Sequence, residues 1–308
     1  ADAGKVLLTA KSAAPMLAAA VNQGGTVRAD SIASRNGEVW IEARGGDARL
    51  AGTTQAAGSG AGQTGGRIVA TGDTVTLASG SLTDASGAAG GGQVLVGGGW
   101  QGKDATIATA GSVTQEAGAV IKADATTSGA GGTAVLWSAK ATRMDGSISA
   151  RGTGSGAGGQ VETSSQGSLG LAGQVDVAAD SGQGGNWLLD PATLDVTTTG
   201  SALVGNTNGT NPTVSNTSIQ TALNAGGTTV TLQADNLITV NADISKTVGA
   251  ASTLTFNSAS GNIVVNNQIS SIAGALNINM GADASQSAGS VTLNNALATN
   301  GGTINVYK

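Results

Sequence analysis

Short apolar segments alternate with runs of small residues along the whole chain, and the alternation repeats in a recognisable form. Each repeat consists of an apolar segment, a run of Gly, Ala and Ser, a Gly-Gly pair and a second apolar segment. The clearest copies span residues 81–96, 119–137, 147–163 and 174–189. The second glycine of the pair stands at positions 92, 132, 159 and 185. A repeat of a few tens of residues is typical of solenoid proteins.

The apolar segments have the length and pattern of short β-strands. Residues 229–232 (Thr-Val-Thr-Leu) show the period-two alternation of a strand with one buried face. Further candidates lie at residues 38–42, 67–70, 74–77, 237–240, 253–256, 262–265, 276–279, 290–293 and 303–306. Each is too short to bury a face alone, so we expect neighbouring strands to stack on one another.

Two β architectures compete for this pattern. Antiparallel sandwiches favour two-residue Asn-Gly or Asp-Gly turns, and these dipeptides occur only at positions 36–37, 145–146, 208–209 and 300–301. A parallel β-helix turns instead through Gly, Ser and Ala links, in which glycine supplies the positive φ values that corners need. A repeat of roughly 20–27 residues suits one turn with three short faces. The sequence therefore predicts an all-β protein folded as a parallel β-helix with Gly-rich turns.

Two segments have helical signals, so one or two short helical decorations are expected. Ser12 is placed to cap a helix that runs through Ala20, with a proline in its first turn. Ser218 is placed to cap residues 219–224, and the Gly-Gly pair at 226–227 would end that helix.

The composition changes near residue 196. Residues 1–195 hold 12 of the 14 basic and 16 of the 19 acidic side chains, whereas 17 of the 20 asparagines follow residue 195. We therefore divide the chain into a β-helix segment, 1–195, and an Asn/Thr-rich segment, 196–308. The second segment either continues the same β-helix or forms a second β domain.

The overall composition narrows the chemistry. Aromatic residues make up 2% of the chain and charged residues 11%, while 51 of 308 residues are glycine. The chain has no Cys and no His, which excludes disulfides, thiolate chemistry and imidazole acid–base or metal chemistry. A net charge of −5 disfavours nucleic acid as a partner, and the chain has no apolar run long enough for membrane insertion. We expect no cofactor and no metal.

Several segments resemble the filamentous haemagglutinin family of secreted exoproteins, the passengers of bacterial two-partner secretion. The matching segments, in the family's order, are VLLTAK (6–11), DASG (84–87), GGQVLVGG (91–98), IKADA (121–125), VLWS (135–138), GSISARG (146–152), VETS (161–164) and GGNWLLDP (184–191). Together they cover about residues 5–195. Residues 196–308 are similar to the family only in the general character of their sequence, without matching segments.

The resemblance implies a right-handed β-helix, a place outside the cell or at the bacterial outer-membrane surface, and roles in adhesion, aggregation or biofilm formation. It also implies export by an outer-membrane transporter that recognises an amino-terminal secretion domain. That domain is not in this sequence, so we expect the chain to be a piece of a longer exoprotein. Host-cell or matrix glycans and neighbouring bacterial cells are the expected binding partners.

The four tryptophans are the only large flat side chains that could contact a ligand. They stand at positions 40, 100, 137 and 187. Trp100 is the best candidate for a ligand contact, because the glycines at 97–99 and 102 predict an exposed loop around it. The alternative for each tryptophan is a packed side chain at the end of a coil or under a loop.

No combination of residues predicts catalysis. Asp84, Asp104, Asp124 and Asp145 recur at regular intervals, but they differ in phase relative to the predicted strands, so we interpret them as turn residues. A polysaccharide-cleaving site would need paired carboxylates. The combination that comes nearest to such a site is Asp124 or Asp145 beside Lys122, Arg143 or Arg151. The threonine runs at 74–76, 197–199 and 229–231 lack the regular spacing of an ice-binding face.

The sequence therefore favours a non-enzymatic, adhesive segment of a large bacterial surface exoprotein. A passive β-helical stalk that presents a distal adhesin or toxin domain is the alternative. A β-helical enzyme that cleaves polysaccharides is the less favoured alternative.

Overall fold

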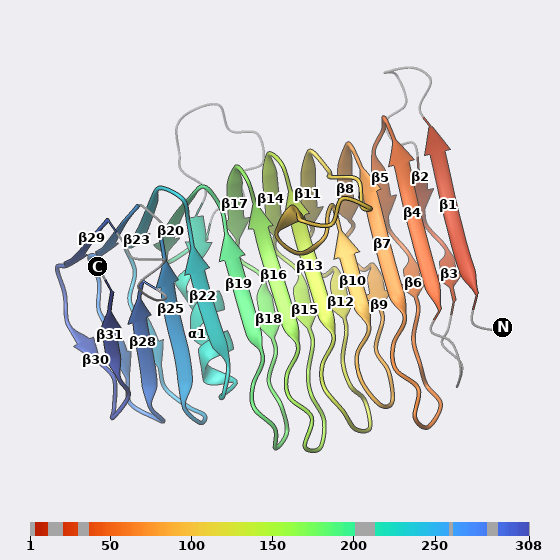
Figure 1. Ribbon diagram of the computed structural model, residues 1–308. Coiled ribbons are helices and arrows are strands. Elements are labelled where there is room, and N and C mark those ends of the chain that lie inside the picture. Colours follow the sequence, from red (N-terminus) through yellow and green to blue (C-terminus); the bar gives the residue numbers. More distant parts are fainter. Residues whose placement is uncertain are drawn as a thin grey trace.

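The chain forms a parallel β-helix of about ten turns, as predicted (Figure 1). The computed structural model describes residues 4–11, 21–29, 37–200, 213–258, 261–281 and 289–307. In Figure 1 the near strands run upward while the chain advances from right to left and returns on the far side, so the coil is right-handed. This is the usual hand of parallel crossovers.

Within the described residues, four parallel sheets form the three sides of the coil. Sheet A contains, in spatial order, β1 (Lys5–Lys11), β4 (Glu38–Arg44), β7 (Arg67–Gly72), β10 (Gln93–Val96), β13 (Thr133–Ser138), β16 (Gln160–Ser165), β19 (Asn186–Asp190), β22 (Thr229–Gln233), β25 (Ser252–Asn257), β28 (Leu276–Met280) and β31 (Ile304–Val306). Sheet B contains β2 (Val21–Gln23), β5 (Ala48–Leu50), β8 (Thr74–Leu77), β11 (Ser112–Gln115), β14 (Ala141–Met144), β17 (Ser168–Leu171), β21 (Thr213–Ser215), β20 (Thr193–Thr197), β23 (Leu237–Val240), β26 (Asn262–Val265) and β29 (Ser290–Leu293).

The third side is divided between two sheets. Sheet C contains β18 (Gln174–Asp176), β15 (Ser147–Ser149), β12 (Val120–Lys122), β9 (Leu82–Asp84), β6 (Thr53–Gln55) and β3 (Thr26–Arg28). Sheet D contains β24 (Ile244–Lys246), β27 (Ile269–Ser271) and β30 (Leu297–Ala298).

The register of sheet A confirms that one repeat of the sequence is one coil. Gln93 pairs with Thr133, Thr133 with Gln160, and Gln160 with Asn186. Each of these residues directly follows the second glycine of a pair, at positions 92, 132, 159 and 185. The glycine pair therefore stands at the same place in every one of these coils, directly before the strand of sheet A.

Alternate strand residues point into the coil and form columns of small apolar side chains. One column in sheet A runs through Ile68, Val94, Ala134, Val161 and Trp187, which pair in register and are all fully buried. Each buried Val or Ile contributes roughly 1.5–3 kcal/mol by leaving water. Because these columns extend across coil boundaries, the core of one coil is completed only by its neighbours.

Among the described residues, five glycine-rich loops project from the coil where sheet C leads into sheet A. Residues 57–65, 86–91, 124–131, 151–158 and 178–184 form them, and they lie side by side below sheet A in Figure 1. We call them the loop stack. The second glycine of each pair closes its loop, as Gly92 N–H does by donating to Ala85 O at 2.8 Å. Successive loops are joined through both legs, for example Gly87 N to Asp124 O at 2.9 Å and Gly91 N to Ala130 O at 2.9 Å.

The close approach of backbones in the loop stack explains why the pairs are glycine. A Cβ atom built on Gly92 would lie 2.1 Å from Gly66 O, and one on Gly91 would lie 1.9 Å from Ala123 O. Both distances are far below van der Waals contact, and the clashing atoms are backbone. Any side chain at these positions would therefore push two coils apart.

The coil is dislocated near residue 196. β20 contains residues 195 and 196, and β21 lies between β17 and β20 in sheet B although it follows β20 in the chain. Helix α1 (Asn216–Asn224) comes next and contacts both β18 and β24, the facing ends of sheets C and D. Sheets A and B nevertheless pass through this region without a break.

The helix near residue 219 is confirmed, but its predicted start is wrong. Ser215 is the N-cap, because its side chain accepts the Thr217 N–H, whereas Ser218 is buried within the helix. Gly226 and Gly227 follow the helix with φ values of +81° and +68°, as the Gly-Gly pair predicted. The helix predicted for residues 12–20 lies outside the described residues.

The glycine argument is testable with Gly92→Ala. We expect it to destabilise the fold by about 3 kcal/mol, because the new methyl group meets a rigid backbone carbonyl. Gly24→Ala is the matched control: no atom lies within 4 Å of its Cβ position, so the stability should change by less than about 0.5 kcal/mol. Urea unfolding measures both. Equal effects of the two substitutions would contradict the packing of the loop stack.

Candidate binding groove and the loop over sheet A

One loop crosses the outer face of sheet A. Residues 97–111 follow β10, include the short 3-10 helix η1 (Trp100–Gly102), and pass in front of the sheet in Figure 1. This insertion accounts for the wide separation in sequence between the paired residues Gln93 and Thr133. Beneath it lies a second apolar cluster outside the coil interior, made of Val69, Leu95, Ile107, Val135 and Trp137.

Three contacts hold the loop on the sheet. Gly102 lies against the Trp137 ring, so that a Cβ atom on it would come within 2.4 Å of Cζ2. Asp104 pairs with Arg67 at 3.4 Å. The backbone N–H of Gln101 donates to Glu162 Oε2 at 2.7 Å. The loop is therefore fixed by packing, by an ion pair and by a hydrogen bond to a charged group.

The loop predicted around Trp100 is present, and it places this residue on the outer surface. Trp100 is partly buried against the apolar cluster. It also lines a hollow of about 390 Å³ with Arg67, Gln93, Leu95 and Lys103 among its neighbours. The indole ring is thus supported from below and borders open space.

The other tryptophans differ in their surroundings. Trp187 is fully buried in the coil, where Nε1 donates to Thr163 Oγ1 at 3.0 Å. Trp137 is covered by the loop and is 6% exposed. Trp40 is half-buried, with Lys5 4.7 Å and Arg67 5.2 Å from its ring centre. Only Trp40 and Trp100 therefore border solvent.

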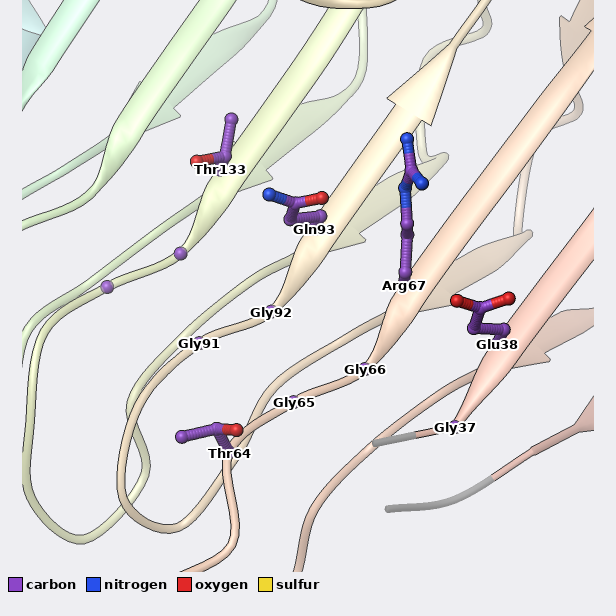
Figure 2. A pocket seen from close by; sticks show the side chains of 12 residues that line it. Gly37, Glu38, Thr64, Gly65, Gly66, Arg67, Gly91, Gly92, Gln93 and Thr133 are labelled. Carbon is purple, nitrogen blue, oxygen red and sulfur yellow. The ribbon is translucent and has the colours of Figure 1, made fainter. Parts of the chain in front are cut away.

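A groove of about 480 Å³ runs across the amino-terminal ends of the sheet A strands β4, β7, β10 and β13 (Figure 2). Its outer side is formed by Glu38, Arg67, Gln93 and Thr133, which occupy the same register position on β4, β7, β10 and β13. Its floor is formed by Gly37, which precedes β4, and by the glycine pairs that precede β7, β10 and β13. It shares Arg67, Gln93 and Thr133 with the hollow beside Trp100. We call the two together the edge groove.

Two ion pairs lie beside the edge groove, whereas Lys103, which also lines it, donates from Nζ to Gln101 Oε1 at 2.7 Å. Lys5 lies 3.6 Å from Glu38, and Arg67 lies 3.4 Å from Asp104. Hydrogen bonds from Thr106, together with Arg67, lower the pKa of Asp104. Exposed pairs of this kind contribute little stability. The charged side chains that line the groove, namely Glu38, Arg67, Lys103 and Asp104, are balanced in sign.

A carboxylic acid lies buried beneath the loop. Glu162 on β16 is fully buried, and burial raises its pKa from 4.5 to about 7 despite the hydrogen bond from Gln101 N–H. Burial also raises the pKa of Asp190, which accepts a hydrogen bond from Gln233 Nε2 at 2.9 Å. Neither Glu162 nor Asp190 lines the edge groove.

Of the four aspartates interpreted as turn residues, Asp84 is instead the last residue of strand β9, and each of the four has a polar partner. Asp84 accepts the Ser86 N–H at 2.9 Å, and Asp104 accepts the Thr106 N–H at 3.0 Å. Asp124 accepts the Arg151 N–H at 2.8 Å, and Asp145 pairs with Arg143 at 2.5 Å. Within the described parts of the chain, no three His, Cys, Asp or Glu side chains are grouped so as to hold a metal ion.

A buried cation lies in the C-terminal half of the coil. Lys246 on β24 is fully buried, and its Nζ donates to the Val248 carbonyl oxygen. Desolvation lowers its pKa. It lies away from the edge groove and has no part in its chemistry.

Comparisons with protein-family models and with curated proteins give no relative. No protein-family model matches the chain, and no curated protein matches it. Among the described residues, no helix is long and apolar enough to cross a membrane.

Sequence reasoning missed the covered part of sheet A and the buried Glu162. A signal was present: residues 134–137 (Ala-Val-Leu-Trp) are apolar without interruption, whereas 229–232 alternate. The structure explains the difference, because β13 is buried on both faces and β22 on one. Which segment covers the outer face depends on the path of a loop, and no periodicity specifies that path.

Glu162→Gln tests the buried acid. Since the folded protein binds this proton more tightly than the unfolded chain, stability should fall as pH rises from about 4.5 towards 7. The wild-type penalty at pH 8 should reach about 3 kcal/mol. The substitution should reduce this slope in urea unfolding measured between pH 4.5 and 8, leaving the part that the raised pKa of Asp190 contributes. Asp73→Asn, at an exposed carboxylate, should leave the slope in place. An unchanged slope in Glu162→Gln would contradict the assignment.

Proposed function

We propose that this chain is a rod-like segment of a secreted bacterial surface exoprotein of the filamentous haemagglutinin type. In this proposal it contributes to cell attachment, aggregation or biofilm formation at the outer-membrane surface. The observation that carries the proposal is the unbroken ladder of sheet A, which joins eleven strands in one direction. Such a ladder suits a stiff element that holds binding surfaces away from a cell.

The proposed mechanism is mechanical and multivalent. Each coil is bonded to its neighbours, so stability accumulates along the rod through nearest-neighbour terms. If one cell carries many copies of the rod, their weak individual contacts add up to firm attachment through avidity. The rod needs no catalytic group for this role.

The resemblance to the family supports the proposal through residues that have clear structural roles. The Gly-Gly pairs at 91–92, 158–159 and 184–185 lie where backbones approach too closely for a side chain. Trp187 and Leu189 of the last matching segment fill the coil interior. These family-like segments thus take part in coil stacking. Export through a two-partner secretion transporter, by way of an amino-terminal secretion domain, follows from the same resemblance.

A passive stalk is the second candidate, and the regularity of the coil favours it. In the coils that contain sheet D, residues paired between successive strands are separated by nearly the same number of positions in the sequence. The pairs Thr229–Thr253, Ile244–Ile269 and Ser252–Leu276 show this. A stalk would present a distal adhesin or toxin domain and bind nothing itself. A polysaccharide-cleaving enzyme remains the less favoured candidate, because Glu162 is fully buried and the aspartates considered have local partners.

The attachment role is testable with beads that carry the purified chain. We expect them to bind saturably to a subset of immobilised glycans or host-matrix proteins, or to beads of the same kind. Heat-denatured chain on matched beads provides the control for non-specific adsorption. A folded chain that binds none of these surfaces would contradict attachment by this segment and favour the passive stalk.

A further inference from the structure

We propose that the edge groove binds a neutral saccharide chain, with the sugar rings aligned along the axis of the coil. This inference rests on the proposed attachment role and assigns it a site and a class of ligand. It is carried by the juxtaposition of an aromatic surface, uncommitted polar side chains and an elongated groove.

The shape of the groove suits an extended polymer. Its wall crosses four successive coils, from Glu38 on β4 to Thr133 on β13. Three strand spacings of roughly 4.7–4.9 Å give a length of about 14 Å. The four wall residues follow one another across these coils, as Figure 2 shows, so the groove suits a ligand several units long.

Trp100 supplies the apolar surface at one side. The indole ring borders the hollow together with Leu95. The short helix around it is closed by Lys103 N donating to Trp100 O at 3.0 Å, and the loop is anchored to Glu162. A held aromatic ring presents contact area at a low cost in conformational entropy. The carbon-bound hydrogens on one face of a pyranose ring would pack on such a surface.

Uncommitted polar side chains line the groove opposite the glycine floor. Within the described parts of the chain, the side chains of Gln93 and Thr133 make no hydrogen bond to another residue, and both border the groove. An amide and a hydroxyl each donate and accept. This combination matches the hydroxyl groups of a sugar, which also do both.

The balance of charge favours a neutral ligand. Glu38 and Asp104 would repel an acidic glycan, while Arg67 and Lys103 would repel a cationic one. Arg67 is already paired with Asp104 at 3.4 Å. An anionic ligand would therefore have to displace a carboxylate before it gained the guanidinium.

The backbone groups along the groove are already hydrogen-bonded, so a peptide could not add there as a further strand. The carbonyl of Gly92 already accepts from Thr133 N at 2.9 Å, and that of Gly66 accepts from Gln93 N at 2.8 Å. Strand addition needs unpaired backbone groups. The ligand must therefore be recognised through side chains, which is the mode that suits a saccharide.

The test measures binding of the folded chain to immobilised linear neutral oligosaccharides of four or more units, with acidic glycans and matrix proteins on the same surface. Trp100→Ala should weaken binding to the neutral glycan by at least about tenfold, a typical cost for losing an aromatic anchor. Gln93→Ala should weaken it by about threefold to tenfold, through lost hydrogen bonds. Tyr307→Ala, at an exposed aromatic residue in the last coil, and Thr231→Ala, on the uncovered part of sheet A, should leave binding unchanged.

Each outcome separates the groove from the wider role. If a neutral glycan binds the Trp100→Ala and Gln93→Ala variants as tightly as wild type, the assignment of the binding site to the edge groove is wrong, and the attachment role stands. If only acidic glycans or proteins bind, the ligand class is wrong and attachment again stands. If the folded chain binds nothing, both proposals fail. Gln93 is exposed, so its variant keeps the test decisive even where Trp100→Ala disturbs the loop.

Discussion

Hydrogen bonds between the backbones of successive coils are the interaction on which the rest of the structure depends. A single coil has three short strands and a thin layer of Val, Ile, Leu and Ala inside, too little to offset the entropy of ordering its chain. Stacking supplies parallel ladders on three sides and continues the apolar columns through the interior. The loop stack extends the same ladder outward, to the point where only glycine fits at positions such as 91 and 92. The high glycine content is therefore a consequence of backbone contact.

This constraint also determines where chemistry can gather. Most coils expose short strands and tight corners, with few side chains that converge. Within the described parts of the chain, two coils are markedly longer: one contains residues 97–111, and the other contains the β21–α1 excursion. The first places the Trp100 ring beside the edge groove, pairs Asp104 with Arg67 and covers the buried acid Glu162 of β16. Lengthening one coil thus adds a surface feature without disturbing the ladder, and the proposed saccharide site lies beside it.

Much of the fold could be predicted from the sequence because it is local and periodic. The Gly-Gly pairs indicated coil length, and the alternation at residues 229–232 indicated a strand with one buried face; both are confirmed. The exposed loop around Trp100 followed from its glycines. Its neighbours Arg67 and Thr133 did not, because they come from the adjacent coils and meet Trp100 only through register and the path of the loop. The burial of Glu162 has the same origin. The start of α1 was misjudged because two serines compete as caps, and only the structure shows that Ser215 accepts the Thr217 N–H.

The central claim is that one continuous ladder sets the dimensions of the molecule, and a distance measurement between spin labels tests it most directly. The chain has no cysteine, so a variant that carries both Thr76→Cys and Thr292→Cys takes spin labels at these two positions and nowhere else. They share one column of sheet B, eight strand steps apart, which corresponds to about 38 Å. Excision of residues 253–276 removes one whole coil in register, since Thr253 pairs with Asn277. The ladder predicts that the folded, excised chain is shorter between the labels by about 5 Å. A broad distribution of distances, or an excised chain that does not fold, would contradict it.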